Sequence, residues 1–145
     1  MSDLASKTAD ALKRAVDKHQ KGDVKAAAKL YKQVLKNHSG NFLANNYYGV
    51  IMLAEVKHQK ALQHFKTALA NKPGWPEAHL NMARTALKIN DVDLALSHAE
   101  KVLATDPDNT KALMYLGTAH HAKGDPEAAI NYFKKVVGIV PNHAG

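Results

Sequence analysis

Residues 110–143 read TKALMYLGTAHHAKGDPEAAINYFKKVVGIVPNH, and near-copies of this stretch run through the chain. Its last proline, Pro141, is preceded by Pro107 and Pro73 at intervals of 34 residues, and a further step back reaches Ser39. A fixed period of this length is typical of an array of helical hairpins. We therefore divide the chain, without insertion or deletion, into four repeats: residues 8–41, 42–75, 76–109 and 110–143.

Two columns of this frame hold only small residues, as the close crossing of two helices requires. They are Ala15, Gly49, Ala83 and Gly117 in the first half of each repeat, and Ala27, Ala61, Ala95 and Ala129 in the second half. Four places after the second column, three repeats carry a large aromatic residue, namely Tyr31, Phe65 and Phe133, whereas the third repeat has Ala99. The apolar period in each half is helical, so we expect two amphipathic helices in every repeat.

Turn residues separate the two expected helices of a repeat, as Gly22-Asp23, Asn90-Asp91 and Gly124-Asp125. Glycine or asparagine can take the left-handed conformation that ends a helix, and aspartate can cap the helix that follows. The second repeat departs from this pattern, because Val56-Lys57 stands at the corresponding place.

The combined pattern resembles the tetratricopeptide repeat. It is carried by Leu113-x2-Leu116-Gly117, Ala129-x3-Phe133 and Pro141, and again by Tyr48-Gly49, Ala61-x3-Phe65 and Pro73. The resemblance covers residues 8–143 and implies an all-α fold, a right-handed superhelical solenoid of four helix-turn-helix repeats in a single domain of residues 1–145. It also implies that the first helix of each pair lines the concave face and the second forms the convex back.

The resemblance directs the search for binding residues to the first helices, 8–21, 42–55, 76–89 and 110–123. At the positions that helix stacking does not occupy, these helices carry a mixed polar and aromatic set of residues: Lys13, Val16, Asn46, Tyr47, Val50, Asn81, Arg84, Lys88, Tyr115, Thr118 and His121. Amide and guanidinium groups donate in fixed geometry, so Asn46, Asn81 and Arg84 could hold the backbone of an extended peptide. The alternative interpretation is that they are ordinary solvated helix residues.

We expect a protein–protein interaction scaffold or adaptor that binds a peptide or protein segment in the concave groove, without catalysis of its own. An alternative is the N-terminal recognition module of a larger bacterial sulfo-, glycosyl- or methyltransferase, by analogy of architecture. Modules of this family that grip chaperone carboxylates need a lysine and an asparagine four apart on the first groove helix. Leu12 and Val16 stand there instead, so we exclude that subfamily.

The chain is basic, with 20 Lys and Arg against 13 Asp and Glu, and residues 1–41 hold nine of the basic and four of the acidic groups. Lys25, Lys29, Lys32 and Lys36 form one stripe along a helix. A nucleic-acid interface would use such a stripe, but no aromatic residue is interleaved with the lysines on the exposed side. We therefore rank nucleic-acid binding below protein binding.

Composition excludes several kinds of site. The absence of cysteine excludes disulfides, thiol nucleophiles and iron–sulfur centres, and no phosphate loop or nucleophile elbow is present. None of the nine histidines has metalloprotease spacing, and we interpret the in-frame pair His64 and His98 as surface patterning. We expect no metal and no cofactor. The longest apolar run, residues 47–54, is too short to cross a bilayer, and the N-terminus carries no readable secretory signal, so we expect a cytoplasmic protein.

The last expected helix has a bare apolar face. A repeat array exposes such a face unless a polar helix covers it, and only four residues follow Pro141 in this sequence. Ile130, Val137, Ile139 and Val140 would then be partly uncovered. We expect either a following domain or a second copy of the chain to cover them.

Overall fold

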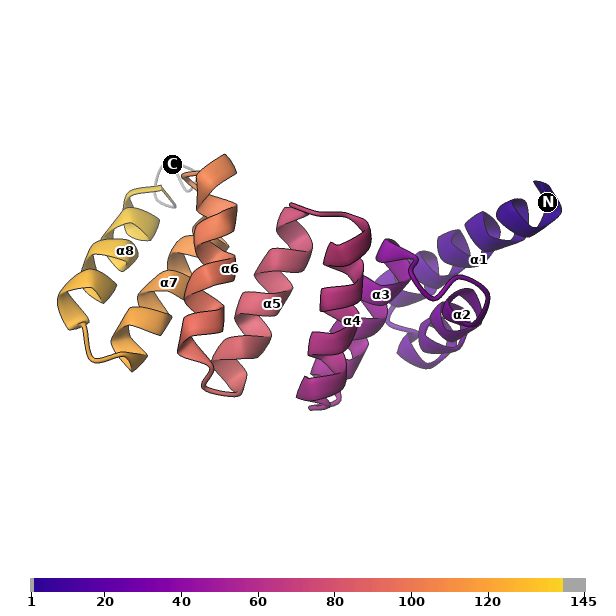
Figure 1. Ribbon diagram of the computed structural model, residues 1–145, viewed down its shortest axis with the longest axis horizontal. Coiled ribbons are helices and arrows are strands. Elements are labelled where there is room, and N and C mark those ends of the chain that lie inside the picture. Colours follow the sequence, from indigo (N-terminus) through magenta and orange to yellow (C-terminus); the bar gives the residue numbers. More distant parts are fainter. Residues whose placement is uncertain (1, 140–145) are drawn as a thin grey trace. The chain divides into compact units, whose positions relative to one another are not determined.

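The computed structural model describes residues 2–139 and, from residue 5 onward, their side chains. All regular structure in this part of the chain is helical (Figure 1). The helices are α1 (Ser2–Gln20), α2 (Val24–Asn37), α3 (Phe42–Ala54), α4 (His58–Asn71), α5 (Pro76–Lys88), α6 (Val92–Thr105), α7 (Thr110–Ala122) and α8 (Pro126–Ile139). The expected all-α class of paired helices is confirmed.

The helices group into two compact units, Met1–Pro73 and Gly74–Gly145. Unit 1 holds α1 to α4 and unit 2 holds α5 to α8, so each unit consists of two helical hairpins (Figure 1). Within unit 1, α2 of the first hairpin packs against α3 of the second, and α6 packs against α7 in the same way in unit 2. Each hairpin therefore covers one face of its neighbour, which a single hairpin could not bury alone.

The first helix is longer than the repeat frame predicts. α1 has 19 residues and begins at Ser2, whereas the other first helices have 13 residues and begin where the frame places them. The frame detects only positions with counterparts in later repeats, so it gives no signal for the extra turns before residue 8. Those turns contribute Ala5 to the surface described in the next section.

In the second and fourth repeats, the two helices cross where a glycine faces an aromatic ring. A Cβ atom added to Gly49 would lie 2.6 Å from Cε1 of Phe65, and one added to Gly117 would lie 2.5 Å from Cε1 of Phe133. Carbon atoms cannot approach so closely without displacement of the ring. The third repeat has Ala83 at the glycine position and Ala99 at the ring position, so the larger residue at the first place is accompanied by a smaller one at the second.

A left-handed residue ends the first helix of every repeat. Gly22, Val56, Asn90 and Gly124 have φ angles of 85°, 64°, 60° and 86°. The next N–H donates back to a carbonyl of the helix, as from Lys57 to Met52 at 2.9 Å, which satisfies an otherwise unpaired group. Val56 thus adopts a conformation that disfavours a β-branched residue, yet its side chain is 71% exposed and packs little.

The aspartate after this turn caps the second helix in three repeats, as predicted. Asp23, Asp91 and Asp125 each accept a hydrogen bond, at 3.2 Å, from the N–H three residues later. Lys57 occupies this place in the second repeat, and its side chain makes no capping bond. The start of α4 is therefore the weakest of the four second-helix starts.

The glycine–ring crossing makes a first prediction. Gly117→Ala should lower the free energy of unfolding by about 1–3 kcal/mol, because the added methyl group must displace Phe133. Gly138→Ala is the matched control, since nothing lies within 4 Å of a Cβ at that position. It should leave stability unchanged or raise it by up to about 1 kcal/mol through helix propensity. Denaturant unfolding followed by circular dichroism measures both, and equal effects would contradict the crossing.

The left-handed valine makes a second prediction. Val56→Gly should raise the free energy of unfolding by about 1 kcal/mol, because it removes the cost of a left-handed β-branched residue. The reverse change at the matching place in the first repeat, Gly22→Val, should lower it by about 1–2 kcal/mol. Thermal and denaturant melts of both variants check the signs. A destabilised Val56→Gly protein would show that the valine side chain contributes more than its backbone costs.

Candidate functional site

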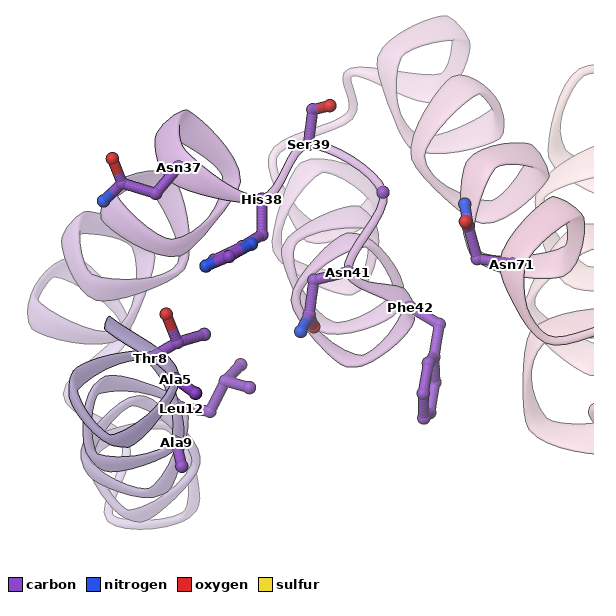
Figure 2. A pocket seen from close by; sticks show the side chains of 11 residues that line it. Ala5, Thr8, Ala9, Leu12, Asn37, His38, Ser39, Asn41, Phe42 and Asn71 are labelled. Atoms are coloured by element: carbon purple, nitrogen blue, oxygen red, sulfur yellow. The ribbon is translucent and has the colours of Figure 1, made fainter. Parts of the chain in front are cut away.

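Two adjoining hollows lie along α1 in unit 1. The larger, of about 810 Å³, lies between α1, the loop before α3 and the start of α3 (Figure 2). The smaller, of about 560 Å³, follows α1 toward its C-terminal end and is lined by Ala9, Leu12, Lys13, Val16, Asp17, Gln20 and Leu43. Because Ala9 and Leu12 line both hollows, they form one continuous furrow, which we call the α1 furrow.

The wider end of the α1 furrow combines apolar and polar groups. In Figure 2 the imidazole of His38 points from the loop toward Thr8 of α1. The Nε2 atom of His38 is buried and has no hydrogen-bond partner within the described part of the chain. Phe42 forms another part of the wall, and the ammonium group of Lys72 lies 4.6 Å from the centre of its ring. This end therefore combines a buried imidazole with a positive charge beside an apolar surface.

The predicted groove residues of unit 1 lie in different environments. Lys13 and Val16 line the furrow. The side chain of Asn46 is completely buried, so the prediction that it faces a ligand is wrong. Tyr47 is half-buried, with its ring 6.1 Å from that of Tyr31. The spacing placed Asn46 on the correct helix but could not show that its neighbours enclose it.

Tyr31 and Tyr47 belong to the packing between the two hairpins of unit 1. Tyr31 is fully buried, and burial, together with the nearby Tyr47 phenol, raises its pKa to about 12. Its hydroxyl lies 3.4 Å from Nδ1 of His19, whose pKa is lowered by burial. A phenol held in this way stays neutral at physiological pH and serves as a structural contact.

The predicted residues of unit 2 lie on α5 and α7. Arg84, Lys88, Thr118 and His121 are exposed, while Asn81 and Tyr115 are half-buried. Burial raises the pKa of Tyr115, and the positive charge of Arg84 partly opposes that shift. The ring of Tyr115 also packs against the core formed by Ala83, Ala99 and Leu116. The charge of Arg84 on α5 thus acts on the phenol of Tyr115 on α7.

In the second and the third repeat, a pair of polar side chains links the two helices of the repeat. Nδ1 of His64 lies 2.9 Å from Oδ1 of Asn45, and Nδ1 of His79 lies 2.8 Å from Nδ1 of His98. His64 and His98 are half-buried and bonded, so their interpretation as surface patterning is wrong. The signal that could have found them is their shared spacing, because both pairs are 19 residues apart and occupy matching places in consecutive repeats.

The histidine pair of unit 2 resists protonation. His79 is only 8% exposed, and burial and then the charge of Lys101 lower its pKa. In a hydrogen bond between two imidazole nitrogens one must donate and the other accept, so at least one ring is unprotonated at Nδ1. The hydrogen bond therefore requires at least one of the two rings to be neutral.

The described residues contain no group of three or more His, Asp or Glu side chains placed to hold a metal ion. None of their helices is long and apolar enough to span a bilayer. Of the predicted bare face on α8, Ile130 and Val137 are 51% and 64% exposed, and Ile139 is half-buried. Val140 lies outside the described residues.

Comparisons of sequence match the repeat pattern. A family model described as tetratricopeptide repeat matches residues 9–76 and 80–144. Human peptidyl-prolyl cis-trans isomerase FKBP4 is 38% identical over 66 residues, covering 46% of this chain and 14% of that protein. Small glutamine-rich tetratricopeptide repeat-containing protein 2 of Saccharomyces cerevisiae is 27% identical over 92 residues, covering 63% of this chain and 27% of that protein. Human protein O-mannosyl-transferase TMTC1 is 25% identical over 125 residues, covering 83% of this chain and 14% of that protein.

The chain therefore spans less than a third of the length of these three relatives. Solved structures match over more of their length. A crystal structure of MamA aligns with a TM-score of 0.85 at 20% identity, covering 94% of this chain and 80% of that one. MamA from Desulfovibrio magneticus RS-1 aligns with a TM-score of 0.84 at 20% identity, covering 95% and 78%. At this identity the likeness concerns the fold.

The lowered histidine pKa values predict that the free energy of unfolding decreases as the pH is lowered. The unfolded chain takes up protons near the ordinary pKa of 6.5, while the folded chain resists protonation of His19, His64 and His79. The stabilisation is therefore full above that pH and is lost as the pH falls through and below it. Denaturant unfolding at pH values from about 7.5 to about 5.5 measures the slope.

The double variant His79→Leu/His98→Tyr is the control for this prediction, because the fourth repeat carries Leu113 and Tyr132 at the same places. It removes one of the three resisting sites and should therefore lose less stability over the same pH range. A slope equal to that of the parent would show that the pair does not contribute to the pH dependence.

Proposed function

Because this chain belongs to the tetratricopeptide repeat family, we propose that it is a protein-interaction module that binds an extended segment of a partner protein and performs no catalysis. The observation that supports the proposal is the α1 furrow, a continuous hollow in unit 1 whose lining combines apolar and polar side chains. A surface of this shape is suited to receiving side chains of a peptide, with polar groups at its rim fixing their direction.

The chemistry of the furrow favours an aliphatic segment with acidic neighbours. Ala9, Leu12 and Leu43 provide an apolar floor that one or two aliphatic side chains would fill. Lys13 lies at the rim and Lys72 stands beside the wider end, while the carboxylate of Asp17, which also lines the furrow, is paired with Lys21 at 3.1 Å. The two lysines therefore provide the positive charge beside the floor. The excess of basic residues in the first repeat would also speed the approach of an acidic segment.

A second contact surface in unit 2 follows from the predicted residues on α5 and α7. Arg84 could donate two parallel hydrogen bonds to a carboxylate, and Tyr115 beside it could cover an apolar group. Asn81, Lys88, Thr118 and His121 complete the proposed surface. Asn46 is left out because it is buried.

A second candidate function is recognition within a longer transferase. It is favoured by the match to protein O-mannosyl-transferase TMTC1, which covers 83% of this chain but only 14% of that protein. An immunoblot of the native source, with antibody raised against this chain, tests it. A band at 15.8 kDa favours an independent module, and a much larger band favours the second candidate.

Selection from a phage-displayed library of random peptides tests the leading proposal. We expect the parent chain to enrich peptides with an aliphatic residue next to acidic ones. Val16→Glu should weaken binding of the enriched peptides at least about tenfold, because it places a charge on the apolar floor. Lys32→Glu, on the exposed side of α2, is the control for added negative charge and should change affinity less than about threefold.

Peptide binding by fluorescence polarisation measures these affinities, and Arg84→Ala reports on the surface of unit 2. The proposal fails if no peptide is enriched, or if Val16→Glu and Lys32→Glu weaken binding equally. Loss with Arg84→Ala but not with Val16→Glu would move the site to unit 2.

A further inference from the structure

One loop forms a large part of the wall at the wider end of the α1 furrow. Residues 38–41, which we call the wall loop, connect α2 with α3. All four line the larger hollow, together with Asn37 before them and Phe42 after them (Figure 2). A displacement of the wall loop would therefore change the shape of the furrow, so the contacts that hold this loop matter for binding.

The side chain of Asn45, on the first turn of α3, holds the wall loop from within. Asn45 is only 2% exposed, and its Nδ2 donates to the carbonyl oxygens of Ser39 and Asn41, both at 2.9 Å. Nδ2 carries two hydrogens and a carbonyl oxygen can only accept, so both donors of the amide are directed to the loop. Asn45 itself is not among the residues that line the furrow. It can act on the furrow only through the position of the loop.

His64 of α4 holds the amide of Asn45 in this orientation. Nδ1 of His64 lies 2.9 Å from Oδ1 of Asn45. Because both amide hydrogens are directed to the wall loop, Oδ1 must accept, and His64 therefore carries a proton on Nδ1. The ring of Tyr48 meets the imidazole edge-on, with the ring centres 5.0 Å apart. A continuous set of hydrogen bonds thus runs from α4 through α3 to the wall loop.

The wall loop lacks a proline that the two corresponding loops possess. The residues that begin the three loops between repeats have nearly the same backbone conformation, with φ and ψ of −139° and 78° twice and of −137° and 81° once. Pro73 and Pro107 follow in the second and third of these loops, and a proline disfavours the helical conformation of the residue before it. Ser39 stands at that place in the wall loop. Its backbone therefore needs another source of restraint.

The place of Asn45 changes together with the proline. In the third and fourth repeats, His79 and Leu113 stand at this place. His79 is bonded to His98 at 2.8 Å, and leucine has no group that could donate. The amide that donates to the loop thus occurs in the repeat whose loop has serine in place of proline. The two features are alternative ways of restraining the same piece of backbone.

We propose that Asn45 is a positioning residue for the α1 furrow, whose amide restrains the wall loop in place of the missing proline while His64 orients that amide. The proposal rests on the proposed function, because it takes the furrow as the surface that binds a partner segment. It follows that affinity for that segment depends on a buried side chain that does not touch it.

Amide hydrogen exchange, followed by nuclear magnetic resonance on the full chain, tests the restraint. The N–H of Asn41 donates to the carbonyl of His38 at 3.1 Å within the loop. The N–H of Lys57, bonded to Met52 at 2.9 Å, reports on the other end of α3. Asn45→Leu/His64→Tyr introduces the side chains found in the fourth repeat and should speed exchange at Asn41 at least about tenfold relative to Lys57. Adding Ser39→Pro should return the ratio to within about threefold of the parent.

Affinity for the peptides that the parent chain enriches tests the positioning role. Asn45→Leu/His64→Tyr should weaken their binding about tenfold, and adding Ser39→Pro should restore it to within about threefold. Asn131→Leu is the control for loss of an asparagine, because Asn131 is exposed on α8 in unit 2. It should change both affinity and exchange at Asn41 less than about twofold. Circular dichroism verifies that every variant is folded.

The results separate this proposal from the proposed function. If the parent chain enriches no peptide, the proposed function fails, and exchange at Asn41 alone decides whether Asn45 restrains the wall loop. The proposal is overturned if the double variant leaves exchange at Asn41 unchanged or if Ser39→Pro does not restore it. It is also overturned if affinity stays equal to that of the parent, or falls without recovery on adding Ser39→Pro. A nitrogen-15 spectrum of the imidazole that places the His64 proton on Nε2 alone would likewise contradict it.

Discussion

The structure depends on how closely two helices of one repeat can approach. In the second and fourth repeats a glycine lies against the aromatic ring that closes the hairpin, and a single methyl group at Gly49 or Gly117 would meet that ring. This contact sets the distance between the two helices and so the position of every side chain around them. The third repeat reaches a close crossing with Ala83 and Ala99 instead.

Once the hairpins are closed, each exposes an apolar stripe on its second helix, and the next first helix covers it within each unit. α3 covers α2 and α7 covers α6, which gives one surface a purely structural role. On α8, Ile130 and Val137 hold the corresponding places and are exposed within the part of the chain that the structure describes. At the N-terminal end of the chain, α1 is longer than its counterparts and forms, with the start of α3, the furrow proposed to bind a partner.

Much of the fold could be predicted because a period of 34 residues repeats the same physical requirements. Helix starts, left-handed turn residues and aspartate caps all follow from it. The candidate site was harder to predict from the sequence, because spacing shows which side of a helix a residue occupies but not how far its neighbours enclose it. Asn46 is buried for that reason, and His64 and His98 face inward because each finds a polar partner 19 residues away. The extra turns of α1 have no counterpart from which to be inferred.

The most direct test of this account is the proximity of glycine and ring in solution. Nuclear Overhauser effects should connect the Hα protons of Gly49 with the ring protons of Phe65, and those of Gly117 with the ring protons of Phe133. Gly138, which has no side chain opposite it, should show no such contact with an aromatic ring. Missing effects at Gly49 and Gly117, or rings that contact other residues instead, would contradict the crossing on which the whole arrangement rests.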